Sequence, residues 1–168
     1  ELSNDAGIFS KGTGSQTIDG GNITIHGGGD ATTIGGAGIG RDNAGTQHIN
    51  ATGNLAMYGG ASNAGHPFAA AAYIGGKDGA NTYIETEGRV YIEAGSGSAS
   101  PALVGSPEGS ASVSISSAVG QDIEIKAAGS MAGIGSISED FGATVNISAG
   151  RDLRIAGSSG KRVMIGSL

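Results

Sequence analysis

Cysteine and tryptophan are absent from this chain of 168 residues, and only 4% of its residues are aromatic. The absence of cysteine excludes a disulfide framework and any metal site built from thiolates. The scarcity of large aromatic rings argues against an ordinary globular core, which normally uses them to fill its volume. A thin core of stacked Ile, Val, Leu and Ala side chains has no such need.

Long apolar runs and basic clusters are also missing. The chain has no apolar stretch of the roughly 18 residues that a membrane-spanning helix needs. The formal net charge is −6 and the charged residues are scattered, so we expect no nucleic-acid partner. The chain begins at Glu1 without a visible signal peptide, so we expect a mature or excised fragment.

Glycine, by contrast, is abundant and periodic. It occurs 34 times, and an apolar run ending in Ile-Gly or Val-Gly recurs five times, with a weaker copy at Ile8-Phe9. A near-constant period indicates a chain built from one stacked unit. The central residues of these runs lie 30 to 35 positions apart and are Ile8, Ile39, Ile74, Val104, Ile134 and Ile165.

Two further strand-like pieces precede each of these runs. The second piece alternates apolar, other, apolar, which is typical of a strand with one buried face. Gly, Asn and Asp between the two pieces predict a tight corner, because these residues tolerate positive φ. The first pieces are centred on Ile18, Ile49, Ile84, Ile115 and Ile147, and the second lie at 23–25, 55–57, 90–92, 123–125 and 153–155.

A unit of three short strands cannot bury its apolar edge alone. Stacked units form three parallel sheets around a continuous core, so the predicted fold is an all-β, right-handed parallel β-helix. Helix is disfavoured because glycine interrupts every window, and 68–72, the best helical candidate, is interpreted as a bulged loop. We expect a single domain, 1–168, with a partial first turn at 1–9 and units 10–40, 41–75, 76–105, 106–135 and 136–166.

Parts of these units resemble repeats of bacterial surface proteins. GGNITIHGG at 20–28 with GAGIG at 36–40 resembles the glycine-rich repeats of large extracellular adhesins. ISAGRDLRIAG at 147–157 resembles the repeats of filamentous-haemagglutinin-type exoproteins. The resemblance spans nearly the whole chain and implies a right-handed β-helix, export to the bacterial cell surface, and a role as a fibrous stalk or adhesive. The amino-terminal secretion motifs of that family are not recognisable.

Catalysis on a β-helix requires two or three carboxylates, or a carboxylate with a basic residue, converging on one face. The best local set is Glu85, Glu87, Arg89 and Glu93, but the flanking loops are short and made of small residues. We therefore assign no catalytic residue and predict a protein that is not an enzyme. The alternative is a carbohydrate-binding or polysaccharide-cleaving β-helix.

Two groups of residues are candidates for binding. Tyr58, Tyr83 and Tyr91 lie on strands where they could stack on sugar rings, although tyrosine also simply favours strands. The third strand has an uncharged outward column, which indicates either a docking face or a face covered by loops. That column is Gly7, Gly38, Tyr73, Leu103, Gly133 and Met164, of which Tyr73, Leu103 and Met164 are the docking candidates.

No cofactor or metal is expected. The Gly-Gly and Asp fragments near 27–30 and 75–79 do not recur from unit to unit, as a calcium-binding solenoid requires. The three histidines occupy different positions and are interpreted as surface residues. Opposite charges on adjacent turns predict the pairs Glu124/Arg154 and Glu93/Lys126, each contributing about 0–1 kcal/mol.

No segment resembles a cap for either end of the stack. Bare strand edges expose backbone donors and acceptors that invite pairing. We therefore expect the chain to be one stretch of a longer solenoid or to stack end to end with its copies. The predicted function is a non-catalytic structural and adhesive one. Its expected partners are its own copies, neighbouring solenoid repeats, surface glycans or host matrix components.

Overall fold

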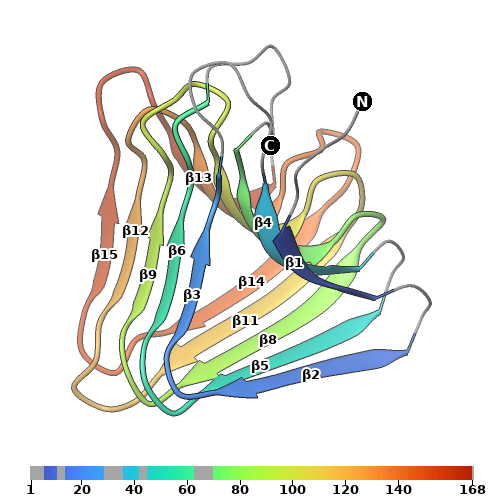
Figure 1. Cartoon of the computed structure of the whole chain (residues 1–168), viewed down its shortest axis with the longest axis vertical. Helices are drawn as coiled ribbons and strands as arrows, with labels where there is room; N and C mark the ends of the chain where they lie inside the picture. The colour runs from blue at the N-terminus through green and yellow to red at the C-terminus, as the bar shows by residue number, and fades with distance from the viewer. Residues whose placement is uncertain (1–5, 11–13, 29–35, 42–44, 63–69, 168) are drawn as a thin grey trace.

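The computed structural model describes residues 6–10, 14–28, 36–41, 45–62 and 70–167. Within these residues it contains sixteen strands and no helix, arranged in three sheets (Figure 1). Sheet A consists of β1 (Ala6–Ser10), β4 (Ala37–Arg41), β7 (Ala72–Gly76), β10 (Ala102–Ser106), β13 (Ala132–Ser136) and β16 (Val163–Ser167). Sheet B consists of β2 (Ser15–Gly20), β5 (Thr46–Ala51), β8 (Ala80–Thr86), β11 (Ala111–Ser117) and β14 (Ala143–Ser148). Sheet C consists of β3 (Ile23–His26), β6 (Leu55–Tyr58), β9 (Val90–Glu93), β12 (Ile123–Lys126) and β15 (Leu153–Ala156).

Neighbouring strands in all three sheets are parallel and belong to successive turns of the chain. The central residues predicted from the sequence face each other in register, as Ile74 and Val104 do in sheet A. The predicted β-solenoid of five turns is therefore confirmed. β1 adds a sixth strand to sheet A alone, as expected for a partial first turn. Of the proposed bulge at 68–72, residues 70 and 71 belong to no strand and Ala72 begins β7, whereas 68 and 69 lie outside the described residues.

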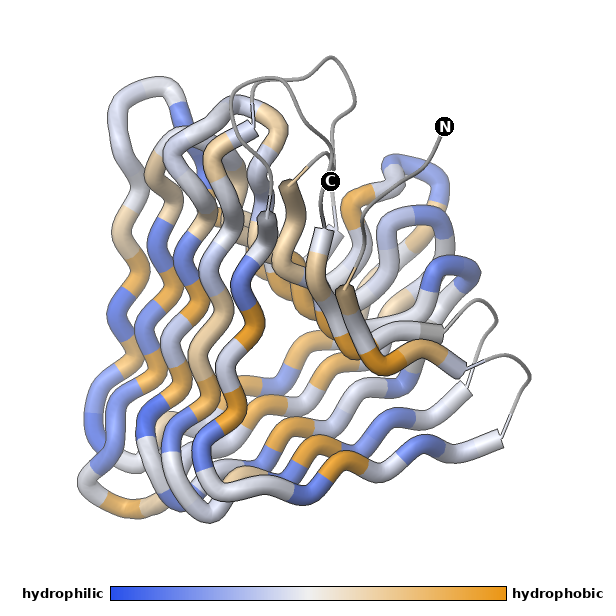
Figure 2. The backbone as a smooth tube through the Cα atoms, in the orientation of Figure 1, coloured by the Kyte–Doolittle hydropathy of each residue, from blue (hydrophilic) through white to orange (hydrophobic). Residues whose placement is uncertain are grey.

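The core is a thin column of aliphatic side chains between the three sheets. In Figure 2 the hydrophobic positions line up from strand to strand across each sheet. Full burial of one such side chain contributes about 1.5–3 kcal/mol. The largest fully buried aliphatic side chains include Ile49, Ile74, Ile84, Ile92, Ile115, Ile125 and Ile134.

The glycine that ends each apolar run has a steric explanation. Gly105 has a φ of 137°, a conformation that side chains rarely adopt. A Cβ at Gly105 would also collide with the carbonyl oxygen of Gly135 in the next turn. In the first turn Phe9 occupies this position, and its ring lies over Gly40, where a Cβ would be 2.9 Å from the ring.

The corners between sheets B and C are stabilised by a ladder of side chains. The Asn22 Oδ1 accepts a hydrogen bond from the Asn54 backbone N–H at 2.8 Å, and the Asn54 Oδ1 accepts one from Arg89 at 2.9 Å. The expectation of positive φ was wrong for most corners, because only Gly120 has it (85°) among their described residues. Glycine is needed instead for close approach, since a Cβ at Gly88 would lie 2.6 Å from the Gly53 carbonyl oxygen.

Candidate functional site

The outer face of sheet C carries a column of stacked rings. Alternation along β3 and β6 turns their isoleucine, leucine and methionine side chains inward and places His26 and Tyr58 outside. The His26 and Tyr58 ring centroids are 4.6 Å apart and nearly parallel, at 14°. The Tyr58 and Tyr91 centroids are 5.5 Å apart, with the rings tilted by 45°. The rings therefore stack along the solenoid axis.

These contacts cover part of the ring faces that a sugar would need. Tyr58 lies between His26 and Tyr91, and the Arg89 guanidinium carbon lies 4.9 Å from the centre of the Tyr91 ring. Arg89 is held there by an ion pair with Glu124 of the following turn, at 3.1 Å. Tyr58, Arg89 and Tyr91 also line an open hollow of about 480 Å³ beside Ala56.

Glu93 is held by two donors on the same face. The Tyr91 hydroxyl donates a 2.8 Å hydrogen bond to its Oε2, and the Lys126 ammonium lies 2.8 Å from its Oε1. Partial burial acts to raise the pKa of Glu93, but the bonds from Lys126 and Tyr91 bring it below its ordinary value. The carboxylate is thus fixed in its ionised form, which suits a structural ion pair better than a proton acceptor.

One of the two predicted charge pairs is confirmed and the other is wrong. Glu93 and Lys126 pair across adjacent turns of sheet C. Arg154, although in register with Glu124, contacts Asp152 at 3.0 Å and Asp122 at 3.7 Å instead. Glu124 is engaged by Arg89, which reaches it from the corner preceding β9.

The candidate carboxylates of the third unit lie on two different faces. Glu85 is an exposed residue of β8 in sheet B, whereas Glu93 belongs to β9 in sheet C. Glu87 lies at the corner between them. Because the corner turns the chain from one sheet to the next, Glu85 and Glu93 do not share a surface on which a glycosidic bond could lie between them.

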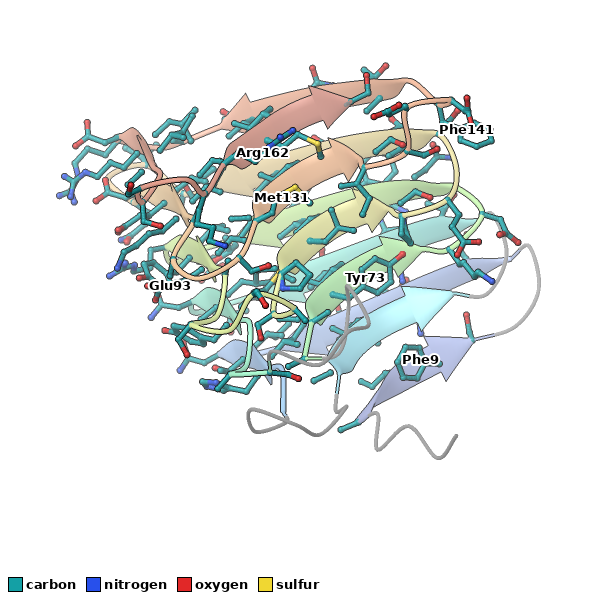
Figure 3. The ribbon with its side chains drawn as sticks, turned by 90° about the horizontal axis from the view of Figure 1, so that it is seen from above. Phe9, Tyr73, Glu93, Met131, Phe141 and Arg162 are labelled. Atoms are coloured by element: carbon teal, nitrogen blue, oxygen red, sulfur yellow. The ribbon has the colours of Figure 1, made fainter. Side chains whose placement is uncertain are left out.

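The uncharged outward column of sheet A is largely covered by the chain itself. Leu103 is fully buried and Met164 is 7% exposed. Tyr73 is half-buried, its hydroxyl donates to the Gly105 carbonyl at 3.1 Å, and burial raises its pKa. Figure 3 shows Tyr73 and Met131 on the side of sheet A that faces the viewer. Leu103 and Met164 are therefore inaccessible to a partner unless the chain rearranges.

A polar ladder inside the core was not predicted. Gln47 is fully buried, and its amide nitrogen donates to the Gln16 side-chain oxygen at 3.0 Å and to the Ile39 carbonyl at 3.3 Å. The Thr82 hydroxyl donates to the Gln47 side-chain oxygen at 3.5 Å. The signal was available, because all three polar residues stand two positions before a central isoleucine, on the inward face.

A second ring stack and several hollows lie on the outer surface. On sheet B, the His48 and Tyr83 centroids are 5.0 Å apart at 10°, and Tyr83 is 40% exposed. Open hollows of about 480, 330 and 680 Å³ lie beside Ala56 on sheet C and at the two ends of β11 on sheet B. Within the described residues, no three His, Asp or Glu side chains are placed to hold a metal ion.

The comparisons with known proteins add no relative. No family model matches the chain, and neither the curated proteins nor the solved structures give a match. In the part of the chain that the structure describes, no helix is long and apolar enough to cross a membrane.

Proposed function

We propose that this chain is a non-catalytic structural and adhesive unit of a bacterial extracellular rod, and that it extends by stacking end to end. The observation that carries the proposal is the exposure of core-type residues at the β15 end of the stack. Leu153 and Ile155 of β15 are 43% and 53% exposed. Their equivalents in the inner turns, such as Ile123 and Ile125, are fully buried.

The two ends have matching patterns. β15 places the exposed Leu153 and Ile155 at one edge of sheet C, and β3 places Ile23, which is partly exposed, and Ile25, which is 7% exposed, at the opposite edge. A second copy placed in the same parallel register would set these pairs against each other. Such an arrangement buries apolar side chains and supplies backbone partners to edge strands. Repeats of a longer chain would cover the same residues in the same way.

β1 restricts how two copies can meet. Sheet A has six strands, whereas sheets B and C have five. A copy that sets its β14 and β15 directly against β2 and β3 therefore brings its β16 to the place of β1. In β1, Phe9 stands where the other apolar runs end in glycine, and Ile8 is exposed. Both features indicate that β1 is weakly held. We infer that stacking displaces this strand.

The stacking proposal is tested with two neighbouring residues of β15. Ile155 belongs to the inward column that continues Ile125, whereas Ala156 follows it in the outward column next to Lys126. Ile155→Asp places a charge in the interface that stacking would bury, so we expect it to abolish association. Ala156→Asp adds the same charge outside that interface and should leave association intact. Sedimentation velocity at increasing protein concentration measures both, with circular dichroism to confirm folding.

The unmodified chain should form larger species as its concentration rises. A concentration-independent monomer would contradict stacking between copies. Equal association of the Ile155→Asp and Ala156→Asp variants would show that the ends are not the contact surfaces.

A further inference from the structure

The ring stack on the outer face of sheet B stops at Tyr83. His48 covers the Tyr83 face that looks toward the preceding turn, at a centroid distance of 5.0 Å. In the following turn the residue in register with Tyr83 is Ser114. A hydroxymethyl group therefore stands where a third ring would continue the stack, and Tyr83 remains 40% exposed.

The space above Ser114 is wide enough for one ring. Ser114 lies between Tyr83 of β8 and Asn146 of β14, one strand away on each side. Because neighbouring strands are about 4.8 Å apart, the flanking side chains stand about 10 Å apart. A ring stacked on an aromatic face occupies about half of that distance, which leaves room for polar contacts with Asn146.

Two separate hollows flank this place, one at each end of β11. One hollow, of about 330 Å³, is lined by Glu85, Glu87 and Ser116 among others. The other hollow, of about 680 Å³, has a lining that includes Ser112 and Phe141. Phe141, labelled in Figure 3, is 42% exposed. Two exposed rings, Tyr83 and Phe141, thus flank β11, whose outward positions are all serine.

We propose that the outer face of β11 binds an extended neutral polysaccharide, one pyranose ring of which stacks on Tyr83 above Ser114. A pyranose has an apolar C–H face that suits an aromatic ring, and a rim of hydroxyls that donate and accept hydrogen bonds. The Glu85 carboxylate accepts from such hydroxyls, and Ser114 and Asn146 both donate and accept. Glu85 and Glu87 repel an acidic polymer, so a neutral chain is favoured.

This site goes beyond the proposed rod function, because it requires only the solenoid fold and not the association of its ends. It also differs from the sheet C tyrosines, which are already in contact with ring and guanidinium neighbours. Hexasaccharides of glucose, mannose, galactose and N-acetylglucosamine are the probes, measured by isothermal titration calorimetry. A sulfated polysaccharide serves as the acidic comparison.

Two substitutions test the geometry. Tyr83→Ala removes the stacking face and should weaken binding at least tenfold. Ser114→Tyr fills the vacant place with the ring that continues the stack, so it should abolish binding while the thermal unfolding temperature stays equal or rises. Thr24→Tyr, which adds the same ring at an exposed position of sheet C, should change neither binding nor fold.

The outcomes separate this site from the rod. Measurements on Ile155→Asp should give the same binding as the unmodified chain, so loss of end-to-end stacking and loss of polysaccharide binding are distinguished. Binding of at least one neutral hexasaccharide that Ser114→Tyr removes supports the site. Absence of binding to all four probes, unchanged binding by a folded Ser114→Tyr variant, or tighter binding of the sulfated polymer would overturn it.

Discussion

Single residues carry much of the geometry of this solenoid, because each position repeats in the next turn about 4.8 Å away. A side chain therefore meets its own equivalents on both sides. Gly105 meets Gly75 and Gly135, Tyr58 meets His26, and Asn54 meets Asn22. Which residue type fits a position therefore depends more on the residues at that position in the neighbouring turns than on the local backbone conformation.

Replacing one of the glycines that end the apolar runs should destabilise the chain strongly. In Gly105→Ala the Cβ collides with the Gly135 carbonyl, and the φ of 137° is unfavourable for alanine. Backbone strain and overpacking each cost about 1–3 kcal/mol, so we expect a loss of about 2–5 kcal/mol in urea unfolding. Gly21→Ala is the control, because a Cβ there meets nothing within 4 Å. Equal stability of the two variants would refute the steric explanation.

The ion pair of Asp122 should make stability depend on pH. Arg151 donates to both carboxylate oxygens, at 2.7 and 2.6 Å, and lowers the pKa of Asp122 from 3.8 to about 2. Because the pKa is lower in the folded state, the stabilisation is fully present above about pH 5 and is lost as the pH falls from 4 to 2. Urea midpoints of the chain and of Asp122→Asn should differ at pH 7 and converge near pH 2. A constant difference over this range would contradict the assignment.

At the scale of strands, apolar periodicity predicted the elements and their register because each strand buries one face. Ile49, Ile84 and Ile115, the central inward residues of three successive sheet B strands, therefore face one another in register. Side-chain pairing was not predictable in the same way. Arg89 reaches Glu124 from a corner, and Arg154 turns to Asp152, because long side chains choose among several acceptors at similar distances. Leu103 is buried by other parts of the chain that cover sheet A, and the alternation of residues within a strand does not predict this.

The buried polar ladder of sheet B should respond cooperatively to substitution. Gln47→Val leaves the Gln16 amide and the Thr82 hydroxyl without the partner they have in the core. We expect a loss of about 1–3 kcal/mol, the usual cost of unsatisfied buried groups. Adding Thr82→Val and Gln16→Val extends the column that already holds Val113 and Val145, and should recover most of that loss. Additive losses in urea unfolding would show that the ladder is not a unit.

For the whole molecule, the solenoid has covered sides and open ends. Its sides are regular sheets with ring stacks and ion pairs, whereas the end turns expose residues of the core type. Five turns span about 24 Å along the axis. The sequence predicted this architecture, but not the break in the ring stack at Ser114. That break is defined only once Tyr83 is seen against His48 on one side and Ser114 on the other.

The axial repeat of the associated chain, measured by cryo-electron microscopy, tests the central claim most directly. If β14 and β15 of one copy meet β2 and β3 of the next with β1 displaced, the repeat is about 24 Å, the height of five turns. Association side by side, an absence of any axial repeat, or a longer repeat of about 29 Å with β1 still in place, would contradict the account.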